Sequence, residues 1–310
     1  GSYRFVGVER KCASTFLSGR SAWIVDEVAG VVWTGSIGRI PPQELAKAKG
    51  LKEFVGRFLP VVLMRGMRLK ARVVWEGSKI PSGALIPFKL EIQSGYGTYT
   101  KPSAVTADGK LLILGTAFPW KTDPVEYRRK LLHENKLVLW DHDPKGAKID
   151  LVEFSDFECP GCKAKWPLIH EAVEKFSGAI RHGMVNYPLT TIHPWAFRAA
   201  SVGWCVAQQN PDLLIPLKEQ FYSMQGAMAV STVGEFGKDF AAGHGLDEKA
   251  FDSCYLKPLS IDGVHRQLSL AQELNVMATP TYFVNGWQIQ VPAKDWFFPF
   301  LERLAAGEQP

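Results

Sequence analysis

The 310-residue sequence lacks any apolar run long enough to span a membrane. The best candidate, residues 54–67, is interrupted by Arg57 and Arg65, whereas a spanning helix needs about 20 consecutive apolar residues. We therefore expect no membrane insertion. No signal peptide is recognised, and Gly1 and Ser2 look like a cloning remnant, so the sequence is expected to begin after any such signal.

An excess of one charge is also missing, because 36 Lys and Arg residues stand against 31 Asp and Glu residues. The basic residues are scattered along the chain, whereas a nucleic-acid surface gathers them on one face. Nucleic-acid binding is therefore not expected. With 310 residues, of which 46% are hydrophobic, the chain is long enough for two ordinary cores, so two domains are expected.

Cysteine is scarce, with five residues in all, and zinc-ligand spacing is missing. Cys159 and Cys162 form a Cys-x-x-Cys pair, but no second such pair and no His-x3-His pair follows. His170, His182 and His193 lie downstream without the paired spacing of metal ligands. A zinc site is therefore disfavoured, and no metal or other cofactor is expected.

The stretch Cys159-Pro160-Gly161-Cys162 is the most informative part of the chain. Residues 151–157 before it are typical of a buried strand, and residues 163–176 after it have a helical pattern. A Cys-x-x-Cys between a strand and a helix is the thioredoxin-type redox arrangement. At a helix N-terminus the first thiol is favoured as thiolate, the nucleophile of disulfide exchange. A purely structural disulfide is the alternative, but so small a loop would constrain the unfolded chain little.

Pro280 supports redox chemistry from a distant part of the sequence. It stands at the head of an apolar strand that ends in the turn Asn285-Gly286. Because proline removes a donor from the sheet, it belongs at a strand start, often after a cis bond. In thioredoxin folds a cis-proline faces the Cys-x-x-Cys and leaves the preceding backbone, here that of Thr279, free to pair with an extended substrate.

Residues from about 148 to 306 resemble the DsbA-like branch of bacterial thiol:disulfide interchange proteins. Four motifs in the same order carry the resemblance: residues 152–159, Tyr187-Pro188-Leu189 with Ile192-His193-Pro194, Ala199-Ala200, and residues 279–286. The resemblance implies an α/β thioredoxin fold with an inserted helical domain at about residues 167–264. It also implies that Cys159 is the attacking thiol, Cys162 the resolving thiol and Pro280 the cis-proline.

By the same resemblance, Glu153 matches the buried acid of the family, six residues before the nucleophile. A carboxylate beneath the disulfide can relay protons to the resolving thiol. An ordinary glutamate at a strand edge is the alternative, although a charge in so apolar a run is expensive to bury. Pro160 and Gly161 depart from the commoner pairs of the family, and Gly161 supplies no side chain to assist the thiolate.

The resemblance also implies a structural disulfide between Cys205 and Cys254, because some DsbA-like sequences join cysteines at similar places. Two separate buried thiols are the alternative, since free cysteine is commonly buried. Cys12 is left over, either as an inert thiol or as one that pairs between subunits. A stable second disulfide would imply a periplasmic or otherwise extracytoplasmic location.

Residues 3–120 are expected to form a separate, smaller α+β domain with an antiparallel sheet. Strands are indicated at 21–33, 69–75, 88–92, 97–100 and 111–117, and a helix at 43–58. Residues 121–147 are expected to form a linker helix at 124–136 and a connection that includes a short strand at 137–140 and a polar turn at 141–146. The catalytic domain is expected to follow at 148–310. This order resembles the disulfide isomerases DsbC and DsbG, whose N-terminal domains dimerise. An unrelated accessory domain is the alternative.

Apolar side chains beside a redox site are candidates for binding unfolded polypeptide. Trp166, Trp195, Met224 and Met228 are such candidates, although core packing is the simpler interpretation of each. His193 is expected to be structural or to begin a helix.

The leading hypothesis is a periplasmic thiol:disulfide oxidoreductase, favoured as an isomerase or reductase by Thr279 and by the additional N-terminal domain. Its expected partners are unfolded or misoxidised proteins, a membrane or soluble redox partner, and a second copy of the chain. The alternatives are a monomeric DsbA-like oxidase and a chaperone-like module whose thiols are secondary. A glutathione-dependent enzyme acting on small molecules is disfavoured, because such enzymes generally lack the resolving thiol.

Overall fold

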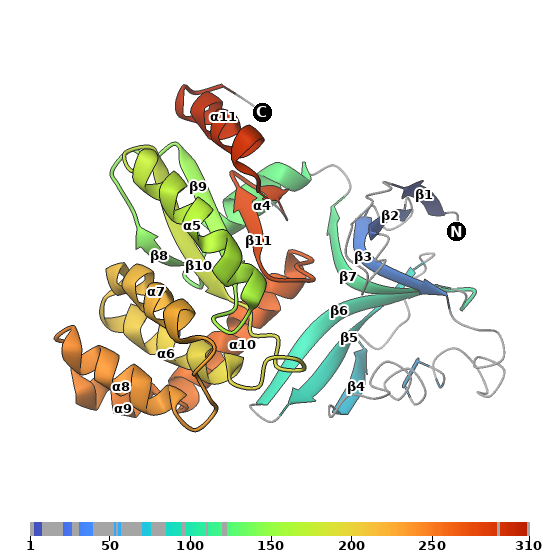
Figure 1. The fold of residues 1–310 in the computed structure, drawn as a ribbon. Helices are drawn as coiled ribbons and strands as arrows, with labels where there is room; N and C mark the ends of the chain where they lie inside the picture. Colours follow the sequence, from blue (N-terminus) through green and yellow to red (C-terminus); the bar gives the residue numbers. More distant parts are fainter. Residues whose placement is uncertain are drawn as a thin grey trace. The chain divides into compact units, whose positions relative to one another are not determined.

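Figure 1 shows the computed structural model of the chain. The structure describes residues 3–7, 21–26, 31–39, 53, 55–56, 70–75, 85–94, 97–109, 111–119, 123–289 and 292–308. The chain divides into two compact units. The first comprises Gly1–Asp123 with Gln272–Asn275, and the second comprises Pro124–Ala271 with Val276–Pro310. Cys12 and most of the helix expected at 43–58 lie outside the described residues.

The first unit contains an antiparallel sheet in the order β1-β2-β3-β7-β6-β5-β4. Its strands are β1 (Tyr3–Gly7), β2 (Ser21–Asp26), β3 (Val31–Arg39), β4 (Lys70–Trp75), β5 (Leu85–Ser94), β6 (Gly97–Thr106) and β7 (Leu111–Pro119). The single strand expected at 21–33 is therefore wrong, because β2 and β3 pair antiparallel and the chain reverses between them. Along β5, buried Phe88, Leu90 and Ile92 alternate with more exposed residues, as in a sheet with one covered face.

The second unit is built on a mixed sheet in the order β12-β11-β9-β10-β8. These strands are β8 (Leu139–His142), β9 (Ile149–Ser155), β10 (Ile180–Asn186), β11 (Thr281–Val284) and β12 (Trp287–Ile289). The central strand β9 pairs parallel with β10 and antiparallel with β11. All seven of its residues are buried, which is typical of a strand covered by helices on both faces.

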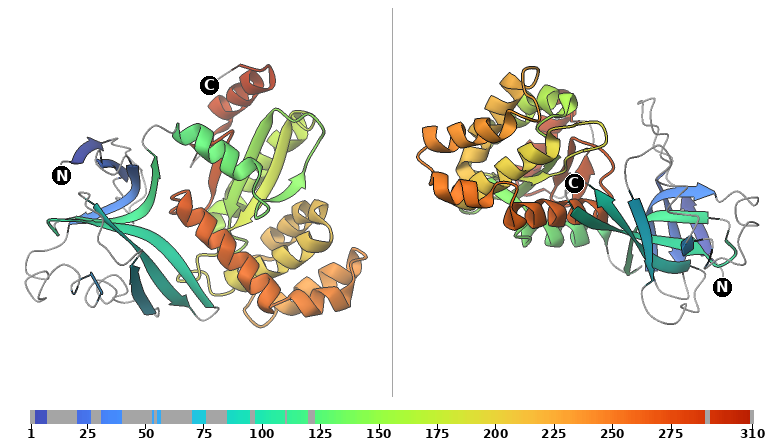
Figure 2. Two further views of the ribbon diagram at one scale, coloured as in Figure 1. Left: turned by 180° about the vertical axis from the view of Figure 1, so that it is seen from behind. Right: turned by 90° about the horizontal axis from the view of Figure 1, so that it is seen from below.

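Side chains of β9 alternate between these two faces. Ile149 and Leu151 join the core formed with α5 (Pro160–Lys175) and α11 (Lys294–Ala305). Asp150 points the other way, where its carboxylate contacts His133 of α4 (Pro124–His133) at 2.5 Å. Two views in Figures 1 and 2 show α5 and α4 on opposite sides of the sheet. Glu153 and Ser155 therefore lie on the same face as α5.

Further helices lie between β10 and β11, and Figures 1 and 2 show α6 to α9 gathered at one end of the sheet. They are α6 (Ala196–Gln209), η2 (Pro211–Leu213), α7 (Leu214–Met224), α8 (Val233–Gly243), α9 (Glu248–Cys254) and α10 (Pro258–Glu273). The expected start of this insertion, at residue 167, is wrong. Pro167 lies inside α5, whose apolar face carries buried Trp166 and Ile169 and continues to Lys175. One missing N–H donor does not end a helix that is held by its buried face.

The expected linker at 121–147 is also wrong in part, because α4 and β8 belong to the second unit. Strand β8 pairs antiparallel with β10 as an edge of the sheet, and Leu139 lies opposite Met184. Leu132 of α4 is buried as well. The sheet of the second unit thus begins before residue 148.

The Asn285-Gly286 turn fixes the β11–β12 hairpin against its surroundings. Both residues have positive φ, 46° and 85°, as the favoured two-residue hairpin turn requires. The Asn285 side chain accepts a hydrogen bond from the Asp150 N–H at 2.8 Å, which ties the turn to β9. A Cβ atom on Gly286 would lie 2.1 Å from the carbonyl oxygen of Val125 in α4, so a larger residue does not fit. This turn holds β11, and the residues before it, in register with β9.

A disulfide joins Cys205 of α6 to Cys254 of α9, which is the pairing implied by the resemblance. The two cysteines are 49 residues apart, and in the chain-entropy treatment a loop of this length stabilises the fold by about 4 kcal/mol. The bond lies within the inserted helices. None of the described helices is both long and apolar enough to cross a membrane.

Candidate active site

The two thiols lie where β9 passes into α5. Cys159 immediately precedes the helix in an extended conformation, and Pro160 occupies the first helical position, which needs no N–H donor. Cys159 is 7% exposed, whereas Cys162, in the first turn of α5, is fully buried. Both are free thiols in the structure. Cys159 is therefore the more exposed of two buried thiol residues.

The surroundings separate the acidities of the two thiols. A hydrogen bond from Cys162 lowers the pKa of the Cys159 thiol to about 6, against the opposing effect of burial. The nearby Thr279 side chain and the backbone N–H groups of Cys162 and Gly161 act in the same direction, as expected at a helix N-terminus. Burial raises the pKa of Cys162 well above its ordinary value, and its hydrogen bond to Cys159 and the charge of Glu153 add to this. At neutral pH these shifts favour a thiolate at Cys159 and a neutral thiol at Cys162.

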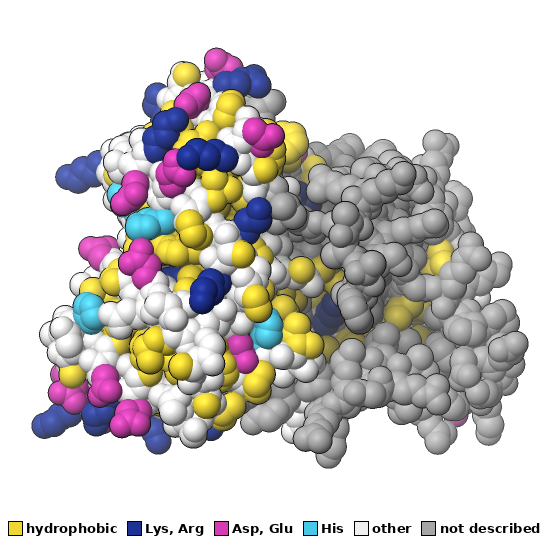
Figure 3. Space-filling model, viewed as in Figure 1, with side chains coloured by type: hydrophobic (Ala, Val, Ile, Leu, Met, Phe, Trp, Pro, Cys, Tyr) yellow, Lys and Arg dark blue, Asp and Glu magenta, His cyan; other side chains and the backbone are white. Residues whose placement is uncertain are grey.

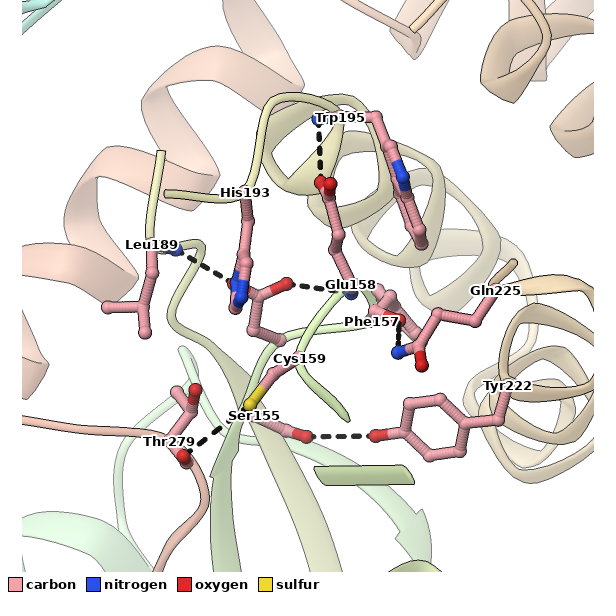
Figure 4. Close-up of polar contacts among 11 residues, drawn as sticks. Ser155, Phe157, Glu158, Cys159, Leu189, His193, Trp195, Tyr222, Gln225 and Thr279 are labelled. Atoms are coloured by element: carbon pink, nitrogen blue, oxygen red, sulfur yellow. Dashed lines mark hydrogen bonds and ion pairs between the residues drawn. The ribbon is translucent and has the colours of Figure 1, made fainter. Parts of the chain in front are cut away.

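The segment before β11 faces the nucleophile. The Thr279–Pro280 peptide bond is cis, and the Cys159 sulfur lies 3.5 Å from the Thr279 carbonyl oxygen. Figure 4 shows the sulfur directed toward Thr279. A Cβ atom on Gly161 would lie 3.5 Å from Cδ of Pro280 and 3.6 Å from the Cys159 sulfur. The glycine therefore leaves the space between the sulfur and the proline open.

A buried ion pair lies beneath Cys162. The Lys218 ammonium of α7 donates to Oε2 of Glu153 at 2.7 Å, and both side chains are fully buried. The ammonium also lies 4.1 Å from the centroid of the Trp166 ring, a cation–π contact. Glu153 is thus an interior carboxylate with a charged partner, and its Oε1 has no hydrogen-bond partner among the described residues.

A second contact between β9 and α7 lies beside the first. The hydroxyls of Ser155 and Tyr222 are 3.2 Å apart. A hydrogen bond of Ser155 with Cys162 opposes the overall rise in the pKa of Cys162. Burial raises the pKa of Tyr222 well above its usual range, so it stays a neutral donor. Two residues along a strand and four along a helix both advance about 6 to 7 Å. The inserted helix therefore matches β9 with two polar pairs.

Asp156 and Glu158 organise the loop around Cys159, and Figure 4 shows the contact of Glu158 with Trp195. One Asp156 oxygen accepts from the Leu189 N–H at 2.9 Å and contacts Nδ1 of His193 at 2.7 Å. This hydrogen bond raises the pKa of His193 above its ordinary value. Glu158 accepts from the Trp195 N–H at 2.6 Å. His193 has a structural partner here, and the acids that hold this loop were missed from the sequence.

The residues suggested as a substrate groove fall into two groups. Trp166 and Trp195 are buried, so core packing describes them, whereas Met224 is exposed and Met228 is partly buried. In Figure 3, hydrophobic side chains are interspersed with charged ones over the visible face of the second unit. Among the described residues, no group of three or more His, Cys, Asp or Glu side chains is arranged to hold a metal ion.

Comparison with known proteins gives a partial match in sequence. A family model described as "Thioredoxin" matches residues 144–296. The second unit has a thioredoxin fold. The sheet order, the position of the dithiol and the inserted helices agree with this match, and the fold class predicted from the sequence is confirmed.

Curated relatives include a Na(+)/H(+) antiporter NhaA 3 from Salinispora tropica, 27% identical over 148 residues. That alignment covers 46% of this chain and 21% of the relative. A Na(+)/H(+) antiporter NhaA 1 from Mycolicibacterium vanbaalenii is 30% identical over 174 residues, 54% of this chain and 27% of the relative. The chain therefore spans only about a fifth to a quarter of the length of these relatives.

Solved structures similar to this chain include ScsC of Proteus mirabilis in a transitional conformation, with 16% identity and a TM-score of 0.49 over 60% of this chain and 80% of that one. BdbD of Bacillus subtilis, oxidised, has 23% identity and a TM-score of 0.48, covering 54% and 92%. The thiol-disulfide exchange protein alpha-DsbA2 of Wolbachia pipientis has 16% identity and a TM-score of 0.48, covering 59% and 93%.

The acidity of Cys159 predicts a pH-dependent stability of the reduced protein. Its lowered pKa means that the thiolate favours the folded state, a contribution fully present above the unfolded thiol pKa and lost as pH falls through about 6. Between pH 6 and 8 the reduced protein should therefore gain stability relative to Cys159→Ser, because Cys162 stays neutral there. Urea unfolding measures this gain, and thiolate absorbance at 240 nm should titrate near pH 6. A stability difference that falls with pH would contradict the assignment.

The Glu153–Lys218 pair predicts that the single variant Lys218→Met loses much more free energy of unfolding than the double variant does. Lys218→Met leaves the Glu153 carboxylate buried without its cation, which should lower the free energy of unfolding by about 3–5 kcal/mol. In Glu153→Gln/Lys218→Met both charges are removed, so most of this loss should be recovered. Urea unfolding of the wild type, both single variants and the double variant forms a complete cycle. Additive losses would show that the pair makes no coupled contribution.

Proposed function

We propose that this chain is an extracytoplasmic protein thiol:disulfide oxidoreductase that acts as an isomerase or reductase. The observation that carries the proposal is the asymmetry of the two thiols. Cys159 is acidic and reaches the surface beside Thr279 and cis-Pro280, whereas Cys162 is neutral and buried behind it. This arrangement suits attack on an external disulfide followed by internal resolution.

In the first step, the Cys159 thiolate attacks one sulfur of a substrate disulfide. A bond forms between the Cys159 sulfur and that substrate sulfur, and the second substrate sulfur leaves as a thiolate. The backbone of Thr279 is placed to pair with an extended substrate segment, since its carbonyl lies beside the Cys159 sulfur. The product is a mixed disulfide.

The mixed disulfide has two exits. Cys162 can transfer its proton to Glu153 and attack the Cys159 sulfur, which releases the substrate as a dithiol and oxidises the enzyme pair. Alternatively, a thiol of the substrate attacks, so that the substrate is rearranged and the enzyme returns reduced. The first exit is reduction and needs a membrane or soluble redox partner to reset the dithiol, and the second is isomerisation.

The Cys205–Cys254 disulfide supports an extracytoplasmic location, because stable structural disulfides persist mainly in oxidising compartments. We further propose a homodimer formed through residues 3–120, so that two active sites act on one bound substrate. The support is the order of an N-terminal domain before the catalytic domain, which resembles DsbC and DsbG.

Isomerase activity predicts reactivation of a scrambled, multi-disulfide test protein in a glutathione buffer. The wild type should restore its activity, and Cys159→Ser should restore none, because the attacking sulfur is missing. Cys162→Ser should retain rearrangement but accumulate mixed disulfides, detectable by mass spectrometry.

Three other results would distinguish the isomerase from the reductase and from the two alternative functions. Oxidation of reduced test protein without reactivation would identify a one-way oxidase. Insulin reduction without reactivation would identify a reductase. Suppression of aggregation that survives Cys159→Ser/Cys162→Ser, with no reactivation by the wild type, would identify a chaperone-like module.

The dimer predicts that the full chain, 34.5 kDa, sediments at twice its mass. Deleting residues 3–120 should give a monomer with reduced isomerase activity, because two sites no longer act on one substrate. Sedimentation velocity of both forms measures this. A truncated protein that still dimerises would refute the role of the first domain.

A further inference from the structure

Three ionisable side chains from neighbouring strands lie next to one another under the dithiol. They are Glu153 of β9, His182 of β10 and Asp141 of β8, and all three are buried. Nδ1 of His182 hydrogen-bonds with Oδ1 of Asp141. Nε2 of the same ring faces Oε2 of Glu153 at 3.9 Å. His182 therefore stands between two carboxylates, and one of them is the acid beneath Cys162.

Several polar atoms of this group have no hydrogen-bond partner among the described residues. They are Nε2 of His182, Oε1 of Glu153 and Oδ2 of Asp141. Unpartnered polar atoms in a core are costly, so their retention calls for a role. Here each of these three atoms is able to bind or release a proton without breaking a hydrogen bond to another described residue.

The contact with Asp141 assigns a proton to Nδ1 of His182, because the carboxylate accepts from it. In a neutral ring, Nε2 would then direct a lone pair at the Glu153 carboxylate. Two acceptors facing each other in a dry core are unfavourable, and one proton on either of them removes the conflict. Glu153 and His182 are therefore coupled sites that share one proton.

The charges around this proton allow it to move between His182 and Glu153 at a low cost in free energy. Lys218 is bound to Oε2 of Glu153, and Asp141 is bound to His182. With the proton on His182, each carboxylate has a cationic partner. With the proton on Glu153, the Lys218 and Asp141 charges still balance, so the group stays neutral in either case. Among the described residues, the charge of Glu153 also raises the pKa values of Cys162, Tyr222 and Tyr282, which lie around this site.

We propose that the His182–Asp141 pair holds this shared proton, and so keeps Glu153 ionised as the acceptor for the Cys162 proton. The inference rests on the proposed function. In the mixed disulfide, Cys162 gives its proton to the Glu153 carboxylate, and its thiolate attacks the Cys159 sulfur. The bond between Cys159 and the substrate breaks, and the electron pair leaves with the substrate thiolate. His182 and Asp141 act through Glu153 and are positioning residues.

The test separates formation of the mixed disulfide from its resolution. Reduced protein is mixed with a peptide disulfide and quenched with acid at intervals, and both steps are followed by mass spectrometry from pH 5 to 9. In His182→Asn, the amide can still donate to Asp141 but holds no extra proton, so Glu153 becomes protonated. We expect resolution at pH 7 to slow about tenfold and to recover at higher pH, since a positioned base contributes at least this much. Formation of the mixed disulfide should be unchanged.

Two controls give the result its meaning. His142→Asn alters the neighbouring histidine of β8, whose Nε2 contacts the Ser177 carbonyl oxygen at 2.7 Å, and should behave as the wild type. Glu153→Gln/His182→Asn should resolve no more slowly than Glu153→Gln alone, because His182 acts only through Glu153. An unchanged pH profile in His182→Asn, or additive losses in the double variant, would overturn the inference.

Formation of the mixed disulfide by the wild type tests the proposed function independently of the role of His182. If the wild type forms no mixed disulfide, the proposed function itself fails. If His182→Asn does not fold, nitrogen NMR of histidine-labelled wild type and Glu153→Gln replaces it. The His182 ring should carry protons on both nitrogens in the reduced wild type at pH 7, and on Nδ1 alone in Glu153→Gln. A neutral ring in the wild type would overturn the inference.

Discussion

The second unit depends on the buried ion pair between Glu153 of β9 and Lys218 of α7. Charges in a core are stable only with a partner at short range, and here the two are 2.7 Å apart with no exposure. The pair fixes the inserted helix against the central strand, next to the thiols. It also provides a carboxylate beneath Cys162 that the apolar surroundings alone would not tolerate.

The two cysteines above this ion pair differ in burial and in the pKa of their thiols. Cys159 lies at the start of α5, where hydrogen bonds favour its thiolate, while Cys162 is one turn further into the core. A buried thiol has no water to receive its proton, so resolution needs an internal acceptor. Glu153 is the carboxylate that we propose for this role, and Lys218 and His182 are the charged or titratable side chains beside it.

Local signals in the sequence identified segments that the structure brings together at one site. The Cys-x-x-Cys, the proline at a strand start and the acid on the preceding strand each depend on short stretches, and the structure brings these segments together. The start of the insertion was placed at residue 167, inside the helix that the sequence itself predicted at 163–176, and α5 continues through Pro167 to Lys175. The short strand predicted at 137–140 corresponds to β8, but the sequence did not show that this strand pairs with β10 as part of the same sheet.

The partners of Glu153 were missed because they come from distant parts of the chain. Lys218 lies 65 positions after Glu153, and only packing brings them together. One signal was available, since Leu214, Leu217, Lys218, Phe221 and Tyr222 share one helical face. A lysine on an otherwise apolar face indicates a buried partner. Nothing local pairs His182 with Asp141, because their contact depends on how β8 and β10 align.

The spacing of Lys218 and Tyr222 has a mechanical consequence. Both side chains project from one helix onto one strand, so any movement of α7 away from β9 breaks the ion pair and the hydroxyl contact together. The helical insertion therefore contributes directly to the polar contacts of β9, and an unrelated helical segment could not replace it without loss of these contacts. A replacement insert would have to carry a cation and a hydroxyl four residues apart, aligned with Glu153 and Ser155, or the Glu153 carboxylate would lose its charged partner.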